Sequence, residues 1–170
     1  NSGVITFVVD NVDELWKLIP YRHVIQVMLR LSFIAPDAPI DLSRKFGAPV
    51  QDALSILDVA NDSGIRINGL CFHVGSQAAT ANTHADALAT CLKLSEKVKE
   101  KGLPDIVRID IGGGFPAHYI SEPGDFDSFC APIREVLANA PDHIQVLAEP
   151  GRAISAPSMA LVCKVIGRAK

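Results

Sequence analysis

The stretch IVRIDIGGGFP at residues 106–116 decides the fold that we predict for this chain. Residues 106–111 are mainly β-branched, which predicts a buried strand, and three glycines then end that strand. Glycines directly after a strand allow positive φ and let the main chain approach a ligand closely. The stretch therefore predicts a strand whose carboxyl end, at Asp110, leads into a functional loop.

Further predicted strands lie on both sides of this stretch, and predicted helices separate them. The predicted strands cover residues 4–9, 24–31, 67–74, 106–111 and 144–148, and an apolar run at 159–166 predicts an exit strand. The predicted helices cover residues 11–19, a segment beginning at 49, a stripe from 88 to about 102, and 126–137. Apolar strands that alternate with helices are typical of a parallel sheet covered by helices.

Each of the first five predicted strands has a polar residue at or beside its carboxyl end. These residues are Asp10, Arg30, His73, Asp110 and Glu149. In a TIM barrel the catalytic groups come from the ends of several strands, whereas an open doubly wound sheet binds ligands mainly at one switch point. We therefore predict an α/β fold, a partial TIM (β/α)8 barrel with about five of the usual eight strands. Because the chain opens at Asn1 without a methionine, we expect it to be part of a longer protein.

The composition is that of a soluble globular protein. The 170 residues are 48% hydrophobic and 21% charged, and the formal net charge is −3. This charge gives no footprint for nucleic acid, and no apolar run is long enough to span a membrane. The four cysteines lie far apart without a CxxC pair, which argues against a disulfide framework or structural zinc and favours the cytoplasm.

Three predicted loops at strand ends offer groups for ligand binding. Main-chain N–H groups of consecutive glycines can form a nest for an anion such as phosphate. In EPGR, residues 149–152, Glu149 offers a carboxylate and Arg152 offers a planar fork for phosphate oxygens. In HVGSQ, residues 73–77, His73 offers an aromatic plane and Ser76 a hydroxyl. Without a ligand, the same residues would form a tight turn, a surface Glu–Arg pair and a packed histidine.

Together these loops have the groups that a phosphorylated heteroaromatic cofactor requires. Pyridoxal 5'-phosphate fits best, because the glycines and Arg152 can bind its phosphate and Glu149 can keep its pyridine nitrogen protonated. A protonated ring acts as an electron sink for a carbanion. The alternative is a metal-dependent TIM-barrel lyase with Asp110, Glu149 and His73 as ligands. Three glycines and an arginine beside those carboxylates favour phosphate, so we predict no metal.

The motifs HVGSQ, DIGGGFP (residues 110–116) and EPGR, in this order and spacing, closely resemble those of a known family. This family is the ornithine/diaminopimelate/arginine decarboxylase group of pyridoxal-phosphate enzymes with the alanine-racemase fold (fold type III). FVVDNVDEL at residues 7–15, VMLRL at 27–31 and RKFGA at 44–48 are similar to further blocks of the family. The resemblance covers essentially the whole chain and implies a pyridoxal-phosphate-binding barrel of the alanine-racemase-like type.

The resemblance also implies a role for each site residue. His73 would stack on the cofactor ring and Glu149 would pair with its pyridine nitrogen, so these two are the expected catalytic residues. Arg30 would lie near the face or edge of the ring. The other expected cofactor ligands would form the phosphate site: Ser76, Gly112, Gly113, Gly114, Gly151 and Arg152.

The details of the motifs resemble the ornithine decarboxylase branch of the family. Phe115-Pro116 after the glycines is similar to that branch, and Gln77 resembles bacterial ornithine or lysine/ornithine forms. The implied activity is decarboxylation of a basic L-amino acid, most closely ornithine to putrescine in polyamine biosynthesis, by a cytoplasmic homodimer. Diaminopimelate or lysine decarboxylase is an alternative, and a non-catalytic regulatory relative resembling the antizyme inhibitors is another.

Two parts of the family's enzyme are not found in this sequence. The resemblance implies a Schiff-base lysine on an early strand, before Asn1, and a C-terminal β domain after Lys170. We therefore expect residues 1–170 to be the central and C-terminal part of the barrel. This part would supply most of the cofactor site, but we expect it to be inactive alone.

Overall fold

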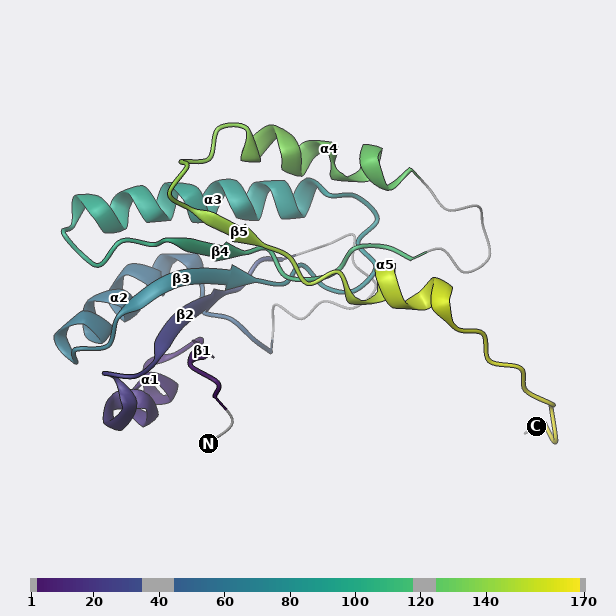
Figure 1. Ribbon diagram of the computed structural model, residues 1–170, viewed down its shortest axis with the longest axis horizontal. Helices are drawn as coiled ribbons and strands as arrows, with labels where there is room; N and C mark the ends of the chain where they lie inside the picture. The colour runs from purple at the N-terminus through teal and green to yellow at the C-terminus, as the bar shows by residue number, and fades with distance from the viewer. Residues whose placement is uncertain (1–2, 35–44, 118–124, 169–170) are drawn as a thin grey trace.

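A five-stranded parallel sheet forms the centre of the structure, a computed structural model that describes residues 3–34, 45–117 and 125–168 (Figure 1). The strands are β1 (Thr6–Val9), β2 (Gln26–Leu31), β3 (Ile67–Phe72), β4 (Arg108–Asp110) and β5 (Gln145–Leu147). They lie side by side in chain order, and every pair is parallel. A doubly wound sheet reverses its strand order at a switch point. The continuous order therefore confirms the prediction of a partial barrel.

Helices connect the strands, as the sequence predicts. The α-helices are α1 (Val12–Leu18), α2 (Ala53–Asp62), α3 (Asn82–Glu100), α4 (Phe126–Leu137) and α5 (Gly151–Ser155), and the short 3-10 helices are η1 (Ile19–Tyr21), η2 (Val50–Asp52) and η3 (Ala156–Ser158). Asn11 caps α1, because its side-chain oxygen accepts a hydrogen bond from the Glu14 N–H at 2.9 Å. Among the described helices, none is both long and apolar enough to span a bilayer.

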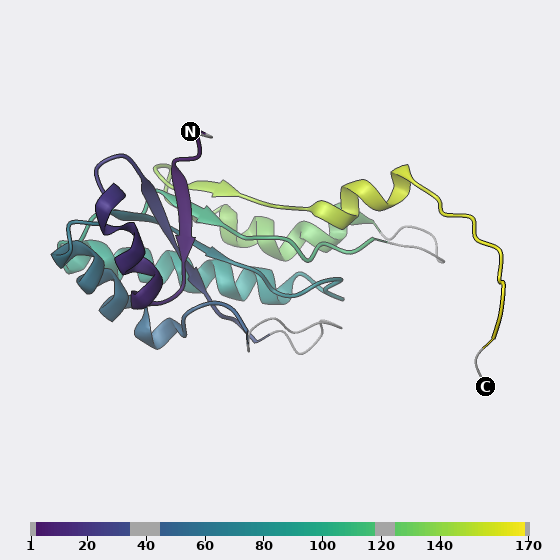
Figure 2. The same cartoon turned by 90° about the horizontal axis from the view of Figure 1, so that it is seen from below.

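The two faces of the sheet differ in what covers them. Helices α2 and α3 cover one face of the sheet (Figures 1 and 2). Val27, Leu29 and Leu31 of β2 are buried and belong to the same core as the apolar stripes of these helices. Side chains alternate between the faces along a strand, so Met28 and Arg30 point to the other face. Met28 packs there over Gly69 of β3, where a Cβ would lie 2.8 Å from the methionine Cγ.

This other face is only partly covered by the described residues. Val8 of β1 remains 54% exposed and Leu147 of β5 remains 37% exposed. The Arg108 guanidinium donates a hydrogen bond to the Gln26 side chain across the same face. In a closed barrel such side chains fill the interior. In this partial barrel the same side chains are left open to solvent.

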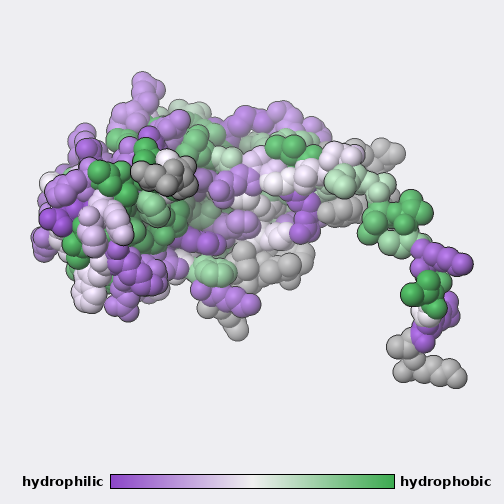
Figure 3. Space-filling view, turned by 60° about the horizontal axis from the view of Figure 1, so that its bottom comes forward, coloured by the Kyte–Doolittle hydropathy of each residue, from purple (hydrophilic) through white to green (hydrophobic). Residues whose placement is uncertain are grey.

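The prediction of an exit strand at residues 159–166 is wrong for this structure. The segment leaves the body as an extended chain after η3, and no strand is assigned to it (Figures 1 and 3). Met159 is 86% exposed and Ile166 is 95% exposed. A strand forms only where a neighbour satisfies its main-chain N–H and C=O groups, and no described strand pairs with this segment.

Leu88 of α3 is fully buried, so truncating its side chain should strongly destabilise the protein. Leu88→Ala should lower the free energy of unfolding by roughly 2–5 kcal/mol, because it removes buried methyl groups and leaves a cavity. Leu92→Ala on the same helix is the control, since Leu92 is only partly buried. Urea denaturation measures both variants. Equal losses in the two variants would contradict this assignment of the core.

Candidate functional site

The polar residues predicted at the strand ends lie along one edge of the sheet. Asp10 directly follows β1, and Arg30 is the next-to-last residue of β2. His73 directly follows β3, Asp110 ends β4, and Glu149 comes two residues after β5. The register pairs Arg30 with Cys71 and Cys71 with Asp110, so these strands end at the same level. All five residues therefore gather at the carboxyl edge, as predicted.

Gly113 lies between His73 and Glu149. A Cβ at Gly113 would be 3.1 Å from Nε2 of His73 and 2.9 Å from the main-chain oxygen of Glu149. The His73 ring and the main chain of Glu149 thus both meet the glycine loop at position 113. A side chain at position 113 would clash with the Glu149 carbonyl and press against the His73 ring.

The glycine loop (residues 112–114) packs against the main chain that follows β3. Gly112 has φ +65°, and a Cβ there would be 2.1 Å from the Phe72 carbonyl oxygen. Gly114 has φ +98°, and its Cβ would be 2.3 Å from the Gly75 carbonyl oxygen. A side chain is excluded at both positions by backbone conformation and by space. The sequence predicts close approach to a ligand, and the structure shows close approach between loops.

Hydrogen bonds fix the glycine loop to its neighbours on both sides. The Gly112 N–H donates to a carboxylate oxygen of Asp110 at 2.8 Å, and the Glu149 N–H donates to the Gly112 carbonyl at 2.9 Å. The Ala78 N–H donates to the Gly114 carbonyl at 2.9 Å. The ends of β3, β4 and β5 are therefore joined into one unit.

His73 presents a neutral aromatic ring at this edge. Its Nδ1 accepts a hydrogen bond from the Gly75 N–H at 3.0 Å, which leaves the ring proton on Nε2. Burial lowers the pKa of His73, the nearby Arg30 lowers it further, and Asp110 opposes both. A ring held neutral and fixed in plane suits stacking against another flat ring.

Arg30 is held by the segment that follows residue 44. Its guanidinium lies over the Phe46 ring, 5.0 Å from the centroid, in a cation–π contact. The next residue, Gly47, donates its N–H to Asp10 at 3.0 Å. This segment therefore anchors both the arginine of β2 and the carboxylate after β1.

Cys71 is buried at the end of β3 among these charges. Burial raises the pKa of its thiol to about 12, and the nearby Asp110 adds to the effect. A thiol with such a pKa carries almost no thiolate at neutral pH, so it is not a nucleophile. Among the described residues, no group of three His, Cys, Asp or Glu side chains could hold a metal ion.

The other expected ligands lie at the start of α5 and in the loop after β3. Ser76 is half-buried, while Glu149, Gly151 and Arg152 are exposed. Glu149 and Arg152 form no ion pair with each other, although both are described. The alternative of a surface Glu–Arg pair therefore lacks support, and the Arg152 guanidinium has no described partner.

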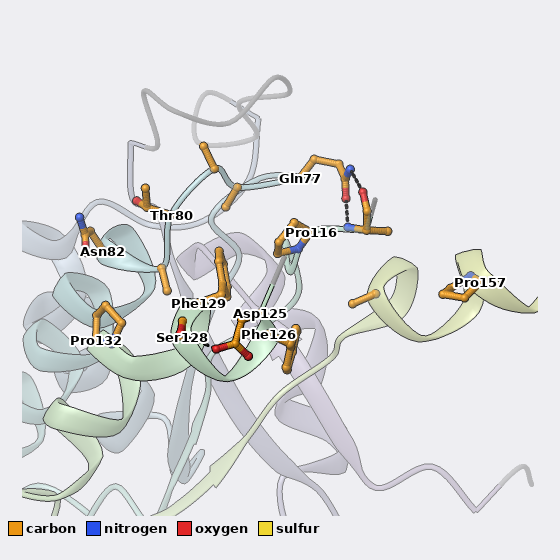
Figure 4. Close-up of a pocket in the computed structure, with 15 residues that line it drawn as sticks. Gln77, Thr80, Asn82, Pro116, Asp125, Phe126, Ser128, Phe129, Pro132 and Pro157 are labelled. Atoms are coloured by element: carbon orange, nitrogen blue, oxygen red, sulfur yellow. Dashed lines mark hydrogen bonds between the residues drawn. The ribbon is translucent and has the colours of Figure 1, made fainter. Parts of the chain in front are cut away.

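A groove of about 880 Å³ lies beside these loops (Figure 4). Gln77 and Pro116 lie on one side of it, Phe126 and Phe129 of α4 on another, and Pro157 of η3 lies at its far end. Its lining is mainly apolar, with a few polar groups from the loops and from the start of α4. Grooves of this size and chemistry are suited to small molecules.

His84 is a site residue that the sequence analysis missed. It is fully buried in α3, and its Nε2 donates a hydrogen bond to the Gly113 carbonyl at 3.0 Å. Its ring lies 4.9 Å from that of Phe115, and its Nδ1 has no described partner. Burial lowers the pKa of His84, although the bond to Gly113 opposes this. The available signal was a histidine four residues before Leu88, one turn ahead of the predicted apolar stripe and in line with it.

These features define a parallel α/β half-barrel whose candidate ligand-binding groups lie at the carboxyl edge. The model of the family "Pyridoxal-dependent decarboxylase, pyridoxal binding domain" matches residues 1–156, and the chain belongs to this family. The family resemblance drawn from the motifs is thereby confirmed.

Two curated relatives illustrate the similarity. The chain is 33% identical over 160 residues to the lysine/ornithine decarboxylase of Selenomonas ruminantium, covering 92% of this chain and 39% of that protein. It is 34% identical over 160 residues to the ornithine decarboxylase of Caenorhabditis elegans, covering 92% of this chain and 37% of that protein. The chain thus spans about two fifths of the length of these relatives.

Solved structures agree with this family assignment. A lysine/ornithine decarboxylase from Vibrio vulnificus, complexed with putrescine, superposes with a TM-score of 0.83 at 45% identity, over 91% of this chain and 40% of that one. A mutant of SrLDC in complex with PLP superposes with a TM-score of 0.79 at 32% identity, over 87% of this chain and 38% of that one. The fold is therefore that of the pyridoxal-binding barrel, in part.

The close packing of the glycine loop predicts that a methyl group at position 112 lowers the free energy of unfolding. Gly112→Ala and Gly102→Ala both place alanine at positive φ, +65° and +72°, but nothing lies within 4 Å of a Cβ at Gly102. Both variants should lose about 1–2 kcal/mol for the left-handed backbone. Gly112→Ala should lose roughly 1–3 kcal/mol more, because its methyl group meets Phe72. Urea denaturation that gave equal losses would contradict the close packing.

The burial of His84 predicts a pH dependence of stability. The pKa of His84 is lower in the folded state than the ordinary value of 6.5, so the unfolded chain binds more protons below that pH. The free energy of unfolding should fall as the pH drops from 7 to 5, by at most about 1.4 kcal/mol per pH unit for this group.

His84→Gln keeps a donor for Gly113 but does not titrate in this range. Its stability should fall less than that of the wild type over the same pH window. His73 and the carboxylates are unchanged, so the difference between the two proteins isolates His84. Parallel curves from thermal denaturation at several pH values would show that His84 does not titrate differently on folding.

Proposed function

We propose that the protein containing this chain is a pyridoxal-phosphate-dependent decarboxylase of a basic L-amino acid. Ornithine is the first candidate substrate, giving putrescine, and lysine is the second. The observation that carries the proposal is the close packing at Gly113, where the glycine loop lies in contact with the His73 ring and the main chain of Glu149. Membership of the pyridoxal-binding family supports it. Related structures from Vibrio vulnificus in complex with putrescine and with cadaverine support the two substrates.

The residues present fit pyridoxal phosphate. His73 would stack on the cofactor ring, because its own ring is neutral and fixed by Gly75. Arg152 is exposed and has no described partner, so its guanidinium is available for phosphate. Ser76, the glycine loop (Gly112, Gly113 and Gly114) and Gly151 would complete the phosphate site. Arg30 would lie near the ring, held there by Phe46.

The reaction breaks the bond between Cα and the carboxyl carbon, releases CO₂ and leaves an electron pair at Cα that a proton then takes up. The bound cofactor supplies an electron sink for that pair. Glu149 would hold a proton at the pyridine nitrogen, so that negative charge is neutralised as it develops. Such a carboxylate stabilises the transition state more than the bound substrate.

The proposed enzyme is larger than this chain. We propose that residues 1–170 form the central and C-terminal part of the barrel, and that the lysine that binds the cofactor covalently and the C-terminal domain lie in segments outside it. Coverage of only 39% and 40% of related proteins supports this, as does the partly uncovered face of the sheet. A cytoplasmic homodimer that acts in polyamine synthesis follows from the same resemblance.

The other hypotheses have less support. Diaminopimelate is a further substrate within the family, and the similarity to ornithine, lysine/ornithine and arginine decarboxylases favours the other basic amino acids. Membership of the pyridoxal-binding family argues against the hypothesis of a metal-dependent lyase. The described residues also contain no cluster of three side chains that could hold a metal ion. A non-catalytic regulatory relative would keep the site geometry and lack turnover, which the following experiment detects.

The role of Glu149 predicts a large loss of turnover on its substitution. Glu149→Gln in the full-length protein keeps the shape but removes the negative charge, so kcat should fall roughly 10²–10³-fold. CO₂ release from ornithine and lysine measures this, with cofactor saturation checked by absorbance. Glu135→Gln, an exposed position on α4, is the control. Wild-type kcat in Glu149→Gln at full occupancy would remove Glu149 from the mechanism, and an inactive wild type would favour the regulatory relative.

A further inference from the structure

We propose that Gln77 is a positioning residue whose side-chain amide fastens the loop after β3 to the loop after β4. This inference rests on the proposed function, because the two loops contain Ser76 and Gly114 of the proposed phosphate site. The role is distinct from phosphate contact, since both polar atoms of the Gln77 amide are engaged by protein main chain.

Gln77 has an unusual main-chain conformation. Its φ is +59°, and it is the one non-glycine residue with positive φ in the described part of the chain. The left-handed region is unfavourable for a residue with a Cβ. Such strain persists only where the surrounding structure fixes the residue, and it is concentrated at functional sites.

The amide of Gln77 offsets this strain with two hydrogen bonds to one residue. Its Oε1 accepts from the Ala117 N–H at 2.7 Å, and its Nε2 donates to the Ala117 carbonyl at 2.8 Å (Figure 4). Two residues facing each other in an antiparallel sheet exchange the same pair of bonds. The Gln77 side chain therefore pairs with the main chain of Ala117 as a residue on a neighbouring strand would. Ala117 lies three residues after the glycine loop.

A third bond makes the connection rigid. Ala78, the residue after Gln77, donates its N–H to the Gly114 carbonyl at 2.9 Å. On the other side of Gln77, Gly75 lies so close to Gly114 that a Cβ on the latter would be 2.3 Å from the Gly75 oxygen. Ser76 is thus enclosed between two fixed points, so its hydroxyl and the glycine main chain keep a constant separation.

The strained backbone of Gln77 lowers the stability of the protein, whereas its two hydrogen bonds to Ala117 raise it. Only the hydrogen bonds hold the loop in position. Gln77→Gly removes the strain together with the two bonds, so the thermal midpoint should change little. Gln77→Ala keeps the strain and loses the bonds, so its thermal midpoint should fall. Both variants release the loop, so both should weaken phosphate binding.

The test titrates the full-length apoprotein with pyridoxal phosphate, followed by absorbance, and measures Tm of each variant. We expect Gln77→Gly and Gln77→Ala to raise the Kd about tenfold, a loss of ~1.4 kcal/mol, while only Gln77→Ala lowers Tm. Gln51→Ala, at an exposed position in η2, is the control and should leave the Kd unchanged.

The outcomes separate the inference from the proposed function. If Gln77→Gly binds pyridoxal phosphate with the wild-type Kd, or if Kd changes in parallel with Tm across the variants, then Gln77 has a merely structural role. Either result would overturn this inference and leave the proposed function standing. A wild-type protein that binds no pyridoxal phosphate would overturn the proposed function and the inference with it. A raised Kd with an unchanged Tm in Gln77→Gly would establish the positioning role.

Discussion

The close approach of the glycine loop to the main chain after β3 and β5 is the constraint on which the site depends. Gly112 and Gly114 have no room for a side chain, because the carbonyl oxygens of Phe72 and Gly75 occupy that space. The same approach lets the Gly112 carbonyl accept from Glu149. The ends of β3, β4 and β5 are thereby held at fixed distances, so the polar groups of the three loops lie close together.

Histidines on both sides of Gly113 show how burial sets the chemistry of this edge. His73 lies on the open side and His84 on the core side, and burial keeps both pKa values low. Each ring is neutral for the same physical reason, but their tasks differ. The ring of His73 offers a flat surface, whereas that of His84 supports the Gly113 carbonyl from below with a hydrogen bond. The charged groups at these strand ends are Asp10, Arg30, Asp110 and Glu149.

Local patterns predicted much of the fold, and long-range contacts account for what they missed. The stripe Ala53, Ile56, Leu57 and Ala60 is buried in α2 as its spacing predicts, since helical periodicity is a local property. The exit strand failed because strand formation needs a partner, which a run of apolar residues does not reveal. The hydrogen bonds of His84 and Gln77 join residues 29 and 40 positions apart, and no local pattern shows such a pairing.

The order of the strands bears on how the protein is synthesised. Because each strand pairs with the one made before it, a chain emerging from the ribosome can add every new β–α unit to an edge that is already complete. The core can therefore grow without waiting for distant sequence. Within this chain, Glu149 is translated two residues after β5, so it joins the carboxyl edge only after the strands that carry Asp10, Arg30, His73 and Asp110 have been made.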